Sequence, residues 1–467
     1  MTDHPKREKP RWHPEDGQQT TIEDSIDRRI RHALRQNIDY SSHDETDSAT
    51  IFSFPGTEPL PIAVDMFAMA ARMQPNNILT HTRCRNQPSE QGFEGTQELE
   101  REVIDAFAQL CGATNPEETI DGYLCAGGTT SILEGLWIGR QWLRHELSLP
   151  TAIGKIKVVT SITTHYAARK ACWILDIPQV TVGLDEQYHF STEQLQDALE
   201  VGYANGVRGF IIIATVGCSL LGKVDDVSRI ADTLVNFRKN HPDSGTYLHI
   251  DAAFGGMILP FTAPPTTGWG FDIEEVSSIT IDPHKANVPY PAGAFLCRKH
   301  LQDAIKHTEG YVNHGDDTTV EGSRTGAAAA ACWTALQYSD YEKTVQDCMA
   351  TKDYFISQLE PLGYFDIING ETTIFAIALR DDLPAKVQNA IMACFSSTIS
   401  IGGKVIHRYI LSDGMLPRDI DMPTDNEELC RKWYKIVVMP HVTRTKINRF
   451  VADLTQAVTT QSVTSTS

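Results

Sequence analysis

The chain has 467 residues, of which 41% are hydrophobic, so it is long enough for two packed domains around a sizeable core. Its formal net charge of −19 argues against nucleic acid or an anionic membrane as a partner. No stretch approaches the ~18 uninterrupted apolar residues of a transmembrane helix, and the polar start lacks a signal-peptide core, so we expect a cytoplasmic protein.

The N-terminal segment, residues 1–58, is predicted to be mostly polar, with one amphipathic helix. Isoleucine or leucine recurs every four residues from Ile22 to Leu34, behind a capping box. This spacing gives one apolar stripe. The residues leave open whether the stripe packs on its own domain or on a second subunit.

From residue 59 to residue 334, short apolar runs alternate with stretches of helical period. This alternation predicts βαβ units and a mainly parallel sheet with helices on both faces. The predicted strands are residues 156–160, 180–182, 209–215, 247–250, 277–281 and 293–297. The predicted helices are residues 59–74, one opened by residues 92–96 and stopped by Gly112, one after Ser131, 163–175, 192–203, one ending at Phe237 and an Ala-rich one ending at Leu336.

The remaining chain is predicted to form a smaller C-terminal domain, residues 335–458. Its expected elements are helices at 341–359 and 383–395, strands at 373–379 and 405–410, and a last helix through Leu454. The Ser/Thr-rich end, residues 459–467, is expected to be a disordered tail.

Two of the predicted strands end in ionisable side chains. Residues 247–250 lead to Asp251, and residues 277–281 lead to the sequence Asp-Pro-His-Lys that ends at Lys285. Parallel strands deliver their carboxyl ends to one edge of a sheet, so we expect Asp251 and Lys285 to face one pocket. Either residue alone would more often be salt-bridged or solvated. Together they indicate a pyridoxal phosphate (PLP) site, because a desolvated amine can form a Schiff base and a buried carboxylate can keep a pyridinium nitrogen protonated.

A second candidate segment runs from Gly127 to Ser131 and reads Gly-Gly-Thr-Thr-Ser at the start of a predicted helix. Backbone N–H groups and the positive end of a helix dipole favour a phosphate at such a place. Ordinary helix capping is the alternative interpretation. The segment is neither a P-loop nor a Gly-x-Gly-x-x-Gly fingerprint, so it predicts backbone binding of a phosphate rather than a nucleotide motif.

The order of these motifs resembles the group II PLP-dependent amino-acid decarboxylases. The resemblance rests on His-Ile-Asp-Ala-Ala-Phe-Gly-Gly at 249–256 and Ser-Ile-Thr-Ile-Asp-Pro-His-Lys at 278–285, and it extends from about Ile78 to Leu454. Within the family the chain is most similar to the archaeal-type tyrosine/aspartate decarboxylases, which in turn resemble sphingosine-phosphate lyase. The resemblance implies fold type I (aspartate aminotransferase-like), a seven-stranded sheet, a homodimer with a shared active site, and decarboxylation of an L-amino acid to the amine and CO2.

The resemblance also implies roles for individual residues. His165 would stack on the cofactor ring, although a helix cap is its plainer interpretation, and Tyr311 on a polar loop is the candidate proton donor. His81 is the candidate substrate-binding residue, although an ordinary loop histidine is more common. The ten cysteines occur singly, so no metal site is expected. The predicted cofactor-binding residues are Gly128, Thr129, Thr130, His165, Thr215, Asp251, Ala253, His284, Lys285, and, on the neighbouring subunit's phosphate, Gly322 and Ser323.

Three positions depart from the family pattern. Thr130, Ile132 and Lys435 stand where the family usually has Glu, Asn and Arg, which puts the contacts of those side chains in doubt. The alternatives are a carbon–carbon lyase like sphingosine-phosphate lyase, diversion of the amine-forming reaction to aldehyde, a PLP-binding protein without turnover, and a nicotinamide oxidoreductase, which lacks its glycine fingerprint. The substrate side chain, aromatic or acidic, stays open.

Overall fold

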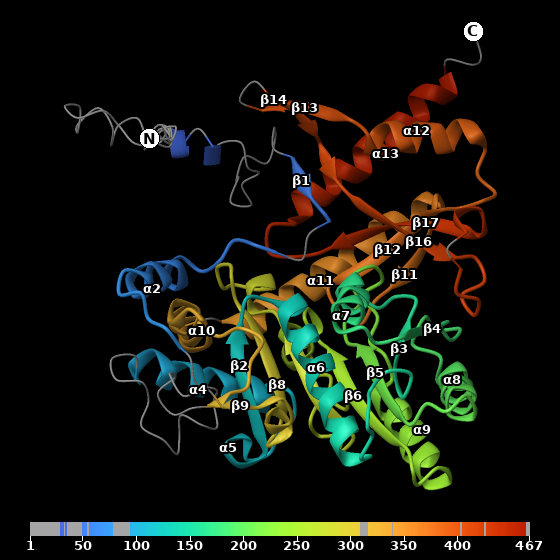
Figure 1. Ribbon diagram of the computed structural model, residues 1–467. Helices are drawn as coiled ribbons and strands as arrows, with labels where there is room; N and C mark the ends of the chain where they lie inside the picture. Colours follow the sequence, from blue (N-terminus) through green and yellow to red (C-terminus); the bar gives the residue numbers. More distant parts are fainter. Residues whose placement is uncertain are drawn as a thin grey trace, which may run out of the picture. The chain divides into compact units, whose positions relative to one another are not determined.

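The computed structural model describes residues 29–31, 33–34, 49–53, 56–77, 94–308, 316–338, 340–401, 404–424 and 426–463 (Figure 1). The chain divides into two units, Met1–His43 and Asp44–Ser467. In the first unit the described residues are helical, and Ile30 and Leu34 are exposed. The rest of the predicted N-terminal helix lies outside the described residues.

The second unit contains a seven-stranded sheet with the order β2-β8-β7-β6-β5-β3-β4. Its strands β3 to β7 pair in parallel, whereas β8 runs antiparallel to both of its neighbours. The predicted mainly parallel sheet is therefore confirmed. The strands are β2 (Ile120–Cys125), β3 (Ile156–Ser161), β4 (Gln179–Val182), β5 (Gly209–Thr215), β6 (Gly245–Asp251), β7 (Val276–Ile281) and β8 (Gly293–Arg298).

Helices cover both faces of this sheet, as Figure 1 shows. They are α2 (Pro61–Ala71), α4 (Glu94–Leu110), α5 (Pro116–Thr119), α6 (Gly128–Glu146), α7 (Tyr166–Leu175), α8 (Thr192–Ala204), α9 (Val227–Asn240) and α10 (Gly326–Tyr338). Short connecting elements are η1 (Gly255–Met257), η2 (Leu259–Phe261), η3 (Pro283–Lys285), η4 (Leu301–Ile305), β9 (His307–Thr308) and β10 (Asp316–Asp317).

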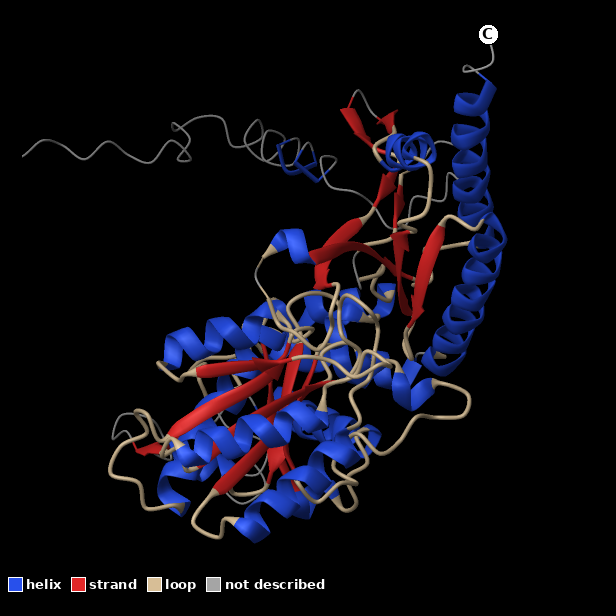
Figure 2. Ribbon diagram, turned by 90° about the vertical axis from the view of Figure 1, so that its right-hand side faces the viewer, coloured by secondary structure: helices blue, strands red, loops and turns tan. Residues whose placement is uncertain are grey.

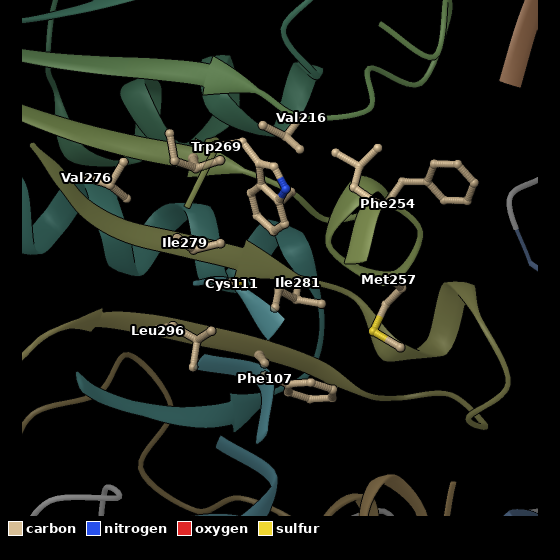
Figure 3. Close-up of a cluster of buried hydrophobic side chains, with 14 of the residues drawn as sticks. Phe107, Cys111, Val216, Phe254, Met257, Trp269, Val276, Ile279, Ile281 and Leu296 are labelled. Carbon is tan, nitrogen blue, oxygen red and sulfur yellow. The ribbon is translucent and has the colours of Figure 1, made fainter. Parts of the chain in front are cut away.

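The pleat of the central strands divides the core into two clusters. Phe210 and Ile212 of β5 belong to the cluster that also holds residues of α4, α8 and α9, whereas Ile211 and Ile213 belong to the cluster under α6 and α7. Figure 3 shows part of the first cluster, with Phe107 of α4 close to the β7 and β8 side chains. Because successive side chains of a strand point to opposite faces, a continuous apolar run fits a sheet that is covered on both faces.

The C-terminal part of the unit has its own antiparallel sheet with the order β11-β12-β17-β16. Phe355, Phe375 and Phe450 join its helices and strands in a separate core. Figure 2 shows the last helix alongside this sheet. The elements are β1 (Thr50–Ile51), α11 (Tyr341–Leu359), η5 (Glu360–Leu362), β11 (Phe365–Asn369), β12 (Ile374–Leu379), α12 (Ala385–Phe395), β13 (Thr398–Ile401), β14 (Lys404–His407), β15 (Tyr409–Ile410), β16 (Ser412–Pro417), η6 (Glu427–Leu429), β17 (Cys430–Val437) and α13 (Arg444–Val463).

Two boundaries differ from the prediction. Helix α13 continues to Val463, so the expected disorder is wrong for residues 459–463. The hydroxyls of Thr455 and Thr459 donate to carbonyl oxygens one turn earlier, each at 2.8 Å, and this satisfies polar side chains inside a helix. The predicted domain boundary at 334/335 falls within α10, and the division into domains stays a prediction.

The described residues also bear on membranes and metals. None of the helices among them is long and apolar enough to span a membrane. Within the same ranges, no group of His, Cys, Asp and Glu side chains is placed to hold a metal ion.

Candidate active site

A cavity of about 450 Å³ opens at the carboxyl ends of β5, β6 and β7, next to the first turn of α6. Strands β12 and β17 of the C-terminal part complete its wall. Nearly all of the predicted cofactor-binding residues therefore meet in one place. The lining residues are Ala126, Gly127, Gly128, Thr129, Thr130, Ile132, His165, Thr215, Gly217, Ser219, Asp251, Ala253, Phe254, Asp282, His284, Lys285, Ile374, Lys435 and Val437.

Lys285 ends the short helical turn η3 that follows β7. Its Nζ atom lies 3.0 Å from Oδ2 of Asp282, and its backbone N–H donates to the Asp282 carbonyl oxygen at 2.9 Å. Burial acts to lower the pKa of Lys285, but the carboxylates of Asp282 and Asp251 outweigh burial and hold this pKa above its ordinary value. The amine is thus held in the cavity by a carboxylate of its own motif.

Asp251 is the last residue of β6 and is 5% exposed. Its Oδ1 atom accepts a hydrogen bond from the backbone N–H of Ala253 at 3.2 Å. Burial raises the pKa of Asp251, while the nearby Lys285 and His165 act in the opposite direction. A carboxylate kept in a cavity beside a lysine can stabilise a proton on a bound basic nitrogen.

His165 is the N-cap of α7, as its plainer interpretation expected, and the predicted start of this helix at residue 163 is wrong. Its Nδ1 atom accepts from the backbone N–H of Ala167 at 3.3 Å, which caps the helix and leaves the proton of the neutral ring on Nε2. Burial lowers the pKa of His165, although Asp251 acts to raise it. The cap fixes a neutral imidazole at the wall of the cavity.

The glycine pair before α6 allows the helix to begin against the Lys285 turn. A Cβ atom on Gly128 would lie 2.8 Å from Oδ2 of Asp282, and one on Gly127 would lie 3.0 Å from Cε1 of His284. Thr129 and Thr130 follow in the first helical turn and line the cavity. The positive end of a long helix therefore faces the cavity, as a phosphate site requires.

The buried polar atoms of the cavity fit a pyridine ring that carries an aldehyde, a hydroxyl and a phosphate. Oγ1 of Thr215 is buried without a hydrogen-bond partner among the described residues, and Thr215 pairs with Asp251 in the register of β5 and β6. An orphaned hydroxyl beside a carboxylate offers one partner for a ring oxygen and one for a ring nitrogen. With the amine of Lys285 and the start of α6, this donor set suits PLP.

Several cavity residues were not predicted from the sequence. Asp282 could have been found, because it stands three residues before Lys285 in the same motif. Tyr290 does not line the cavity itself, but its ring stacks on that of His284 with centroids 4.1 Å apart, and it follows the motif closely as well. Ile374 and Val437 come from β12 and β17, and no local signal marks them.

Two predicted cofactor-binding residues do not line the cavity. Gly322 and Ser323 are exposed, and Ser323 Oγ accepts from Nδ2 of Asn76 at 3.3 Å. Their reach to a neighbouring subunit's phosphate stays a prediction. His81 and Tyr311 lie outside the described residues.

Arg324, which follows these glycine and serine residues, turns into the protein. It forms a buried ion pair with Glu100, donates to the Leu124 carbonyl oxygen at 3.1 Å and lies 4.8 Å from the Tyr123 ring centroid. Arg324 therefore holds the fold together at this point.

A lysine and an aspartate that face one cavity at the carboxyl edge of a mainly parallel sheet, with a helix start beside them, define a PLP-dependent enzyme of fold type I. The chain belongs to the pyridoxal-dependent decarboxylase family, because the model of the "Pyridoxal-dependent decarboxylase conserved domain" matches residues 16–381. It is thus an amino-acid decarboxylase with pyridoxal 5′-phosphate as cofactor.

Curated relatives agree with this assignment. Tryptophan decarboxylase of Clostridium sporogenes is 29% identical over 384 residues, which cover 81% of this chain and 82% of that protein. A probable L-tyrosine/L-aspartate decarboxylase of Methanococcus aeolicus is 25% identical over 378 residues, covering 78% and 85%. The predicted likeness to the archaeal branch is confirmed.

Solved structures share the fold. Glutamate decarboxylase of Lactobacillus brevis superposes with a TM-score of 0.72 at 19% identity, covering 98% of this chain and 95% of that chain. Sphingosine-1-phosphate lyase of Burkholderia pseudomallei superposes with a TM-score of 0.66 at 16% identity, covering 98% and 93%. The fold alone therefore does not separate decarboxylases from this lyase.

Proposed function

We propose that the enzyme decarboxylates L-amino acids with an aromatic, uncharged side chain. The observation that carries the proposal is the charge of the cavity. Among its described lining residues, Lys435 is the only lysine or arginine besides Lys285. Lys285 faces Asp282 and Asp251, so one cation is left for one substrate carboxylate. A distal carboxylate of aspartate or glutamate would have no cation there, and an unpaired buried charge is costly.

Apolar side chains in the same cavity suit an aromatic ring. Ile132, Phe254, Ile374 and Val437 line it. The name of one relative, a tryptophan decarboxylase, points the same way, whereas another, a probable L-tyrosine/L-aspartate decarboxylase, names both an aromatic and an acidic amino acid. Aromatic contact with apolar side chains supplies binding without a second charge.

The chain's own residues have the following roles in the proposal. Lys285 holds the cofactor through its amine, and Asp251 keeps a proton on the ring nitrogen. His165 packs on the ring face, and Thr215 donates to the ring oxygen. When bound, PLP supplies the sink for the electron pair left when CO2 departs.

The phosphate of the cofactor is assigned to the first turn of α6 and to His284. Gly128, Thr129 and Thr130 supply the turn, and Ala253 lies beside it, with its Cβ atom 3.4 Å from a Cβ atom built on Gly128. Burial lowers the pKa of His284 although Asp282 acts to raise it, so the ring is a neutral hydrogen-bonding group there.

Lys435 is assigned to the α-carboxylate of the substrate. It lies on β17, and burial together with the nearby Lys285 lowers its pKa. A lysine offers a point charge where an arginine would offer two parallel hydrogen bonds. Lys435 would therefore hold the carboxylate without a bidentate contact. Tyr311 remains the proposed proton donor and His81 the proposed substrate-side residue.

A homodimer is part of the proposal. Helix α2 exposes Ile62, Val64 and Met69, and Met73 just after it is exposed as well, which gives an apolar surface that a second copy would cover. Gly322 and Ser323 would then reach the partner's phosphate. The cytoplasmic location stays a prediction from composition.

The test is a screen of L-tryptophan, L-tyrosine, L-phenylalanine, L-aspartate and L-glutamate with added cofactor, read as CO2 and amine, with Lys285→Ala as the blank. We expect kcat/KM for the best aromatic substrate to exceed that for either acidic one by about 10²-fold or more, given several kcal/mol for an unpaired charge. Equal or faster turnover of aspartate or glutamate would contradict the proposal. Aldehyde with oxygen uptake would indicate the oxidative route, and cleavage of a phosphorylated amino alcohol would indicate the lyase.

A further inference from the structure

A row of buried polar side chains runs along one face of β6 and β7 and ends next to the cavity. Tyr247 and His249 of β6 lie on the same face as Asp251, and Ser278 and Thr280 of β7 alternate in the same way. Tyr247, His249, Ser278 and Thr280 are each 0% exposed. Such a set of polar groups inside a sheet needs internal partners.

Each of these side chains has an internal hydrogen-bond partner. Together they form a continuous chain of hydrogen bonds, here called the β6–β7 network. Tyr247 Oη donates to Ser278 Oγ at 2.8 Å, and Ser278 Oγ lies 2.7 Å from Nδ1 of His249. Nε2 of His249 lies 3.1 Å from Oγ1 of Thr280, which lies 2.7 Å from Oγ of Ser131 in α6. The network therefore links both strands to the helix.

The hydrogen bond that Ser131 donates at the end of the network fixes which atom donates and which accepts in all the others. Ser131 Oγ donates to the carbonyl oxygen of Ala294 at 3.1 Å, and a carbonyl can only accept. Ser131 must then accept from Thr280, and Thr280 must accept from Nε2–H of His249. The ring's Nδ1 accepts from Ser278. His249 is thus neutral with its proton on Nε2, in agreement with burial that lowers its pKa to about 3.

Helix α6 lies directly on this network because it carries glycines where the network is bulkiest. A Cβ atom on Gly135 would lie 2.6 Å from Nδ1 of His249, and one on Gly139 would lie 2.8 Å from Cδ1 of Tyr247. No side chain of α6 at these two positions separates the helix from the strands. The distance between α6 and strands β6 and β7 is therefore set by hydrogen bonds and close contact rather than by apolar packing alone.

We propose that the β6–β7 network is a positioning device that holds the first turn of α6 at a fixed place over β6 and β7. Ser131 follows Thr130, which lines the cavity, and Asp251 lies two residues beyond His249. The network therefore spans the two ends of the cofactor site, the turn assigned to the phosphate and the carboxylate assigned to the ring nitrogen. The inference rests on the proposed binding of the phosphate by α6.

The test measures cofactor binding, without substrate, in Thr280→Val, Ser131→Ala and Thr280→Ser. Each apoenzyme is titrated with PLP, and the phosphorus NMR shift of the bound phosphate is recorded in each holoenzyme. Thr280→Val keeps the shape of the side chain but leaves Nε2–H of His249 and Oγ of Ser131 without their partner. We expect about tenfold weaker cofactor binding and a changed phosphate shift in Thr280→Val and Ser131→Ala, and wild-type values in Thr280→Ser.

Thr160→Val is the matched control. Thr160 is also a buried strand threonine of the same sheet, and its hydroxyl accepts from Nε2 of Gln179 at 2.7 Å, but it does not line the cavity. The Thr160→Val variant should lose stability as Thr280→Val does, but it should keep wild-type affinity for the cofactor. Equal loss of affinity in Thr160→Val, wild-type affinity in Thr280→Val and Ser131→Ala, or no rescue by Thr280→Ser would overturn the inference.

A cavity-lining variant, Thr129→Val, separates this inference from the assignment of the phosphate. If Thr129→Val weakens cofactor binding and the network variants do not, the positioning role alone fails. If none of these variants affects binding, the phosphate does not lie at α6, and both statements fail.

Discussion

The buried ion pair of Glu100 and Arg324 ties helix α4 to the segment before α10, and its removal tests how this segment is held. The two side chains are 3% and 2% exposed. Glu100 also accepts from the backbone N–H of Leu124 at 2.7 Å and from Nδ2 of Asn77 at 2.5 Å. Arg324 has the Leu124 carbonyl oxygen and the face of Tyr123 as further partners.

These partners make the two single substitutions unequal. Removing one member of a buried pair costs about 3–5 kcal/mol, because the other charge stays buried. After Arg324→Met, Glu100 keeps two N–H donors, so we expect a loss of about 3 kcal/mol in the free energy of unfolding. After Glu100→Gln, the guanidinium stays buried opposite a neutral amide, with the Leu124 carbonyl oxygen and the Tyr123 ring among its remaining partners, so we expect a loss of about 5 kcal/mol in the free energy of unfolding. The double variant should lose less than the sum, because it leaves no unpaired charge.

Urea unfolding of both single variants and the double variant, with the wild type alongside, provides the measurement. A loss below about 1 kcal/mol in Arg324→Met, the range of an exposed ion pair, would refute the reasoning. Unchanged stability with weakened PLP binding would place Arg324 at a phosphate instead. Lys343→Met on the exposed face of α11 is a control for loss of a surface cation and should be nearly neutral.

Three further predictions follow from the cavity and from the contacts beside it. Lys285→Ala should abolish amine formation and remove the absorption band of the bound cofactor; normal turnover would exclude Lys285 as the cofactor lysine. Lys435→Met should raise KM for the amino acid by about 10–100-fold and Lys435→Arg should not, since a charged hydrogen bond contributes about 1.5–3 kcal/mol. Burial acts to raise the pKa of Glu371, but the nearby His189 and the hydrogen bond from Lys223 outweigh it and bring the pKa to about 2 from 4.5. The stability difference between wild type and Glu371→Gln should therefore be full above about pH 4.5 and disappear as the pH falls towards 2, and a constant difference would contradict this.

Strands with one continuous apolar run were predicted well, whereas the mixed strand β2 was not. Strand β5 matches its predicted range because its side chains are buried on both faces. Strand β2 was missed because Ile-Asp-Gly-Tyr-Leu-Cys contains an aspartate and a glycine, which favour turns. Gly122 is needed there, since a Cβ atom would lie 2.4 Å from the carbonyl oxygen of Phe295 on β8.

The site was predictable where a strand end marks it and unpredictable where packing creates it. Asp251 and Lys285 follow predicted strands, so their meeting in one cavity could be expected. The inward turn of Arg324 could not, because its partner Glu100 is 224 residues away in the chain. The closure of the cavity by β17 depends on how the second sheet packs.

Strand β6 shows why fold and site are difficult to separate in this chain. Leu248 and Ile250 face the apolar core, and the alternate residues Tyr247, His249 and Asp251 lead through the β6–β7 network to the cavity. A slip of one residue would exchange the two faces, placing Ile250 at the cavity and two polar side chains in the core. Register is therefore fixed by both faces at once, and a substitution that disturbs the buried polar face should disturb cofactor binding before it disturbs the apolar core.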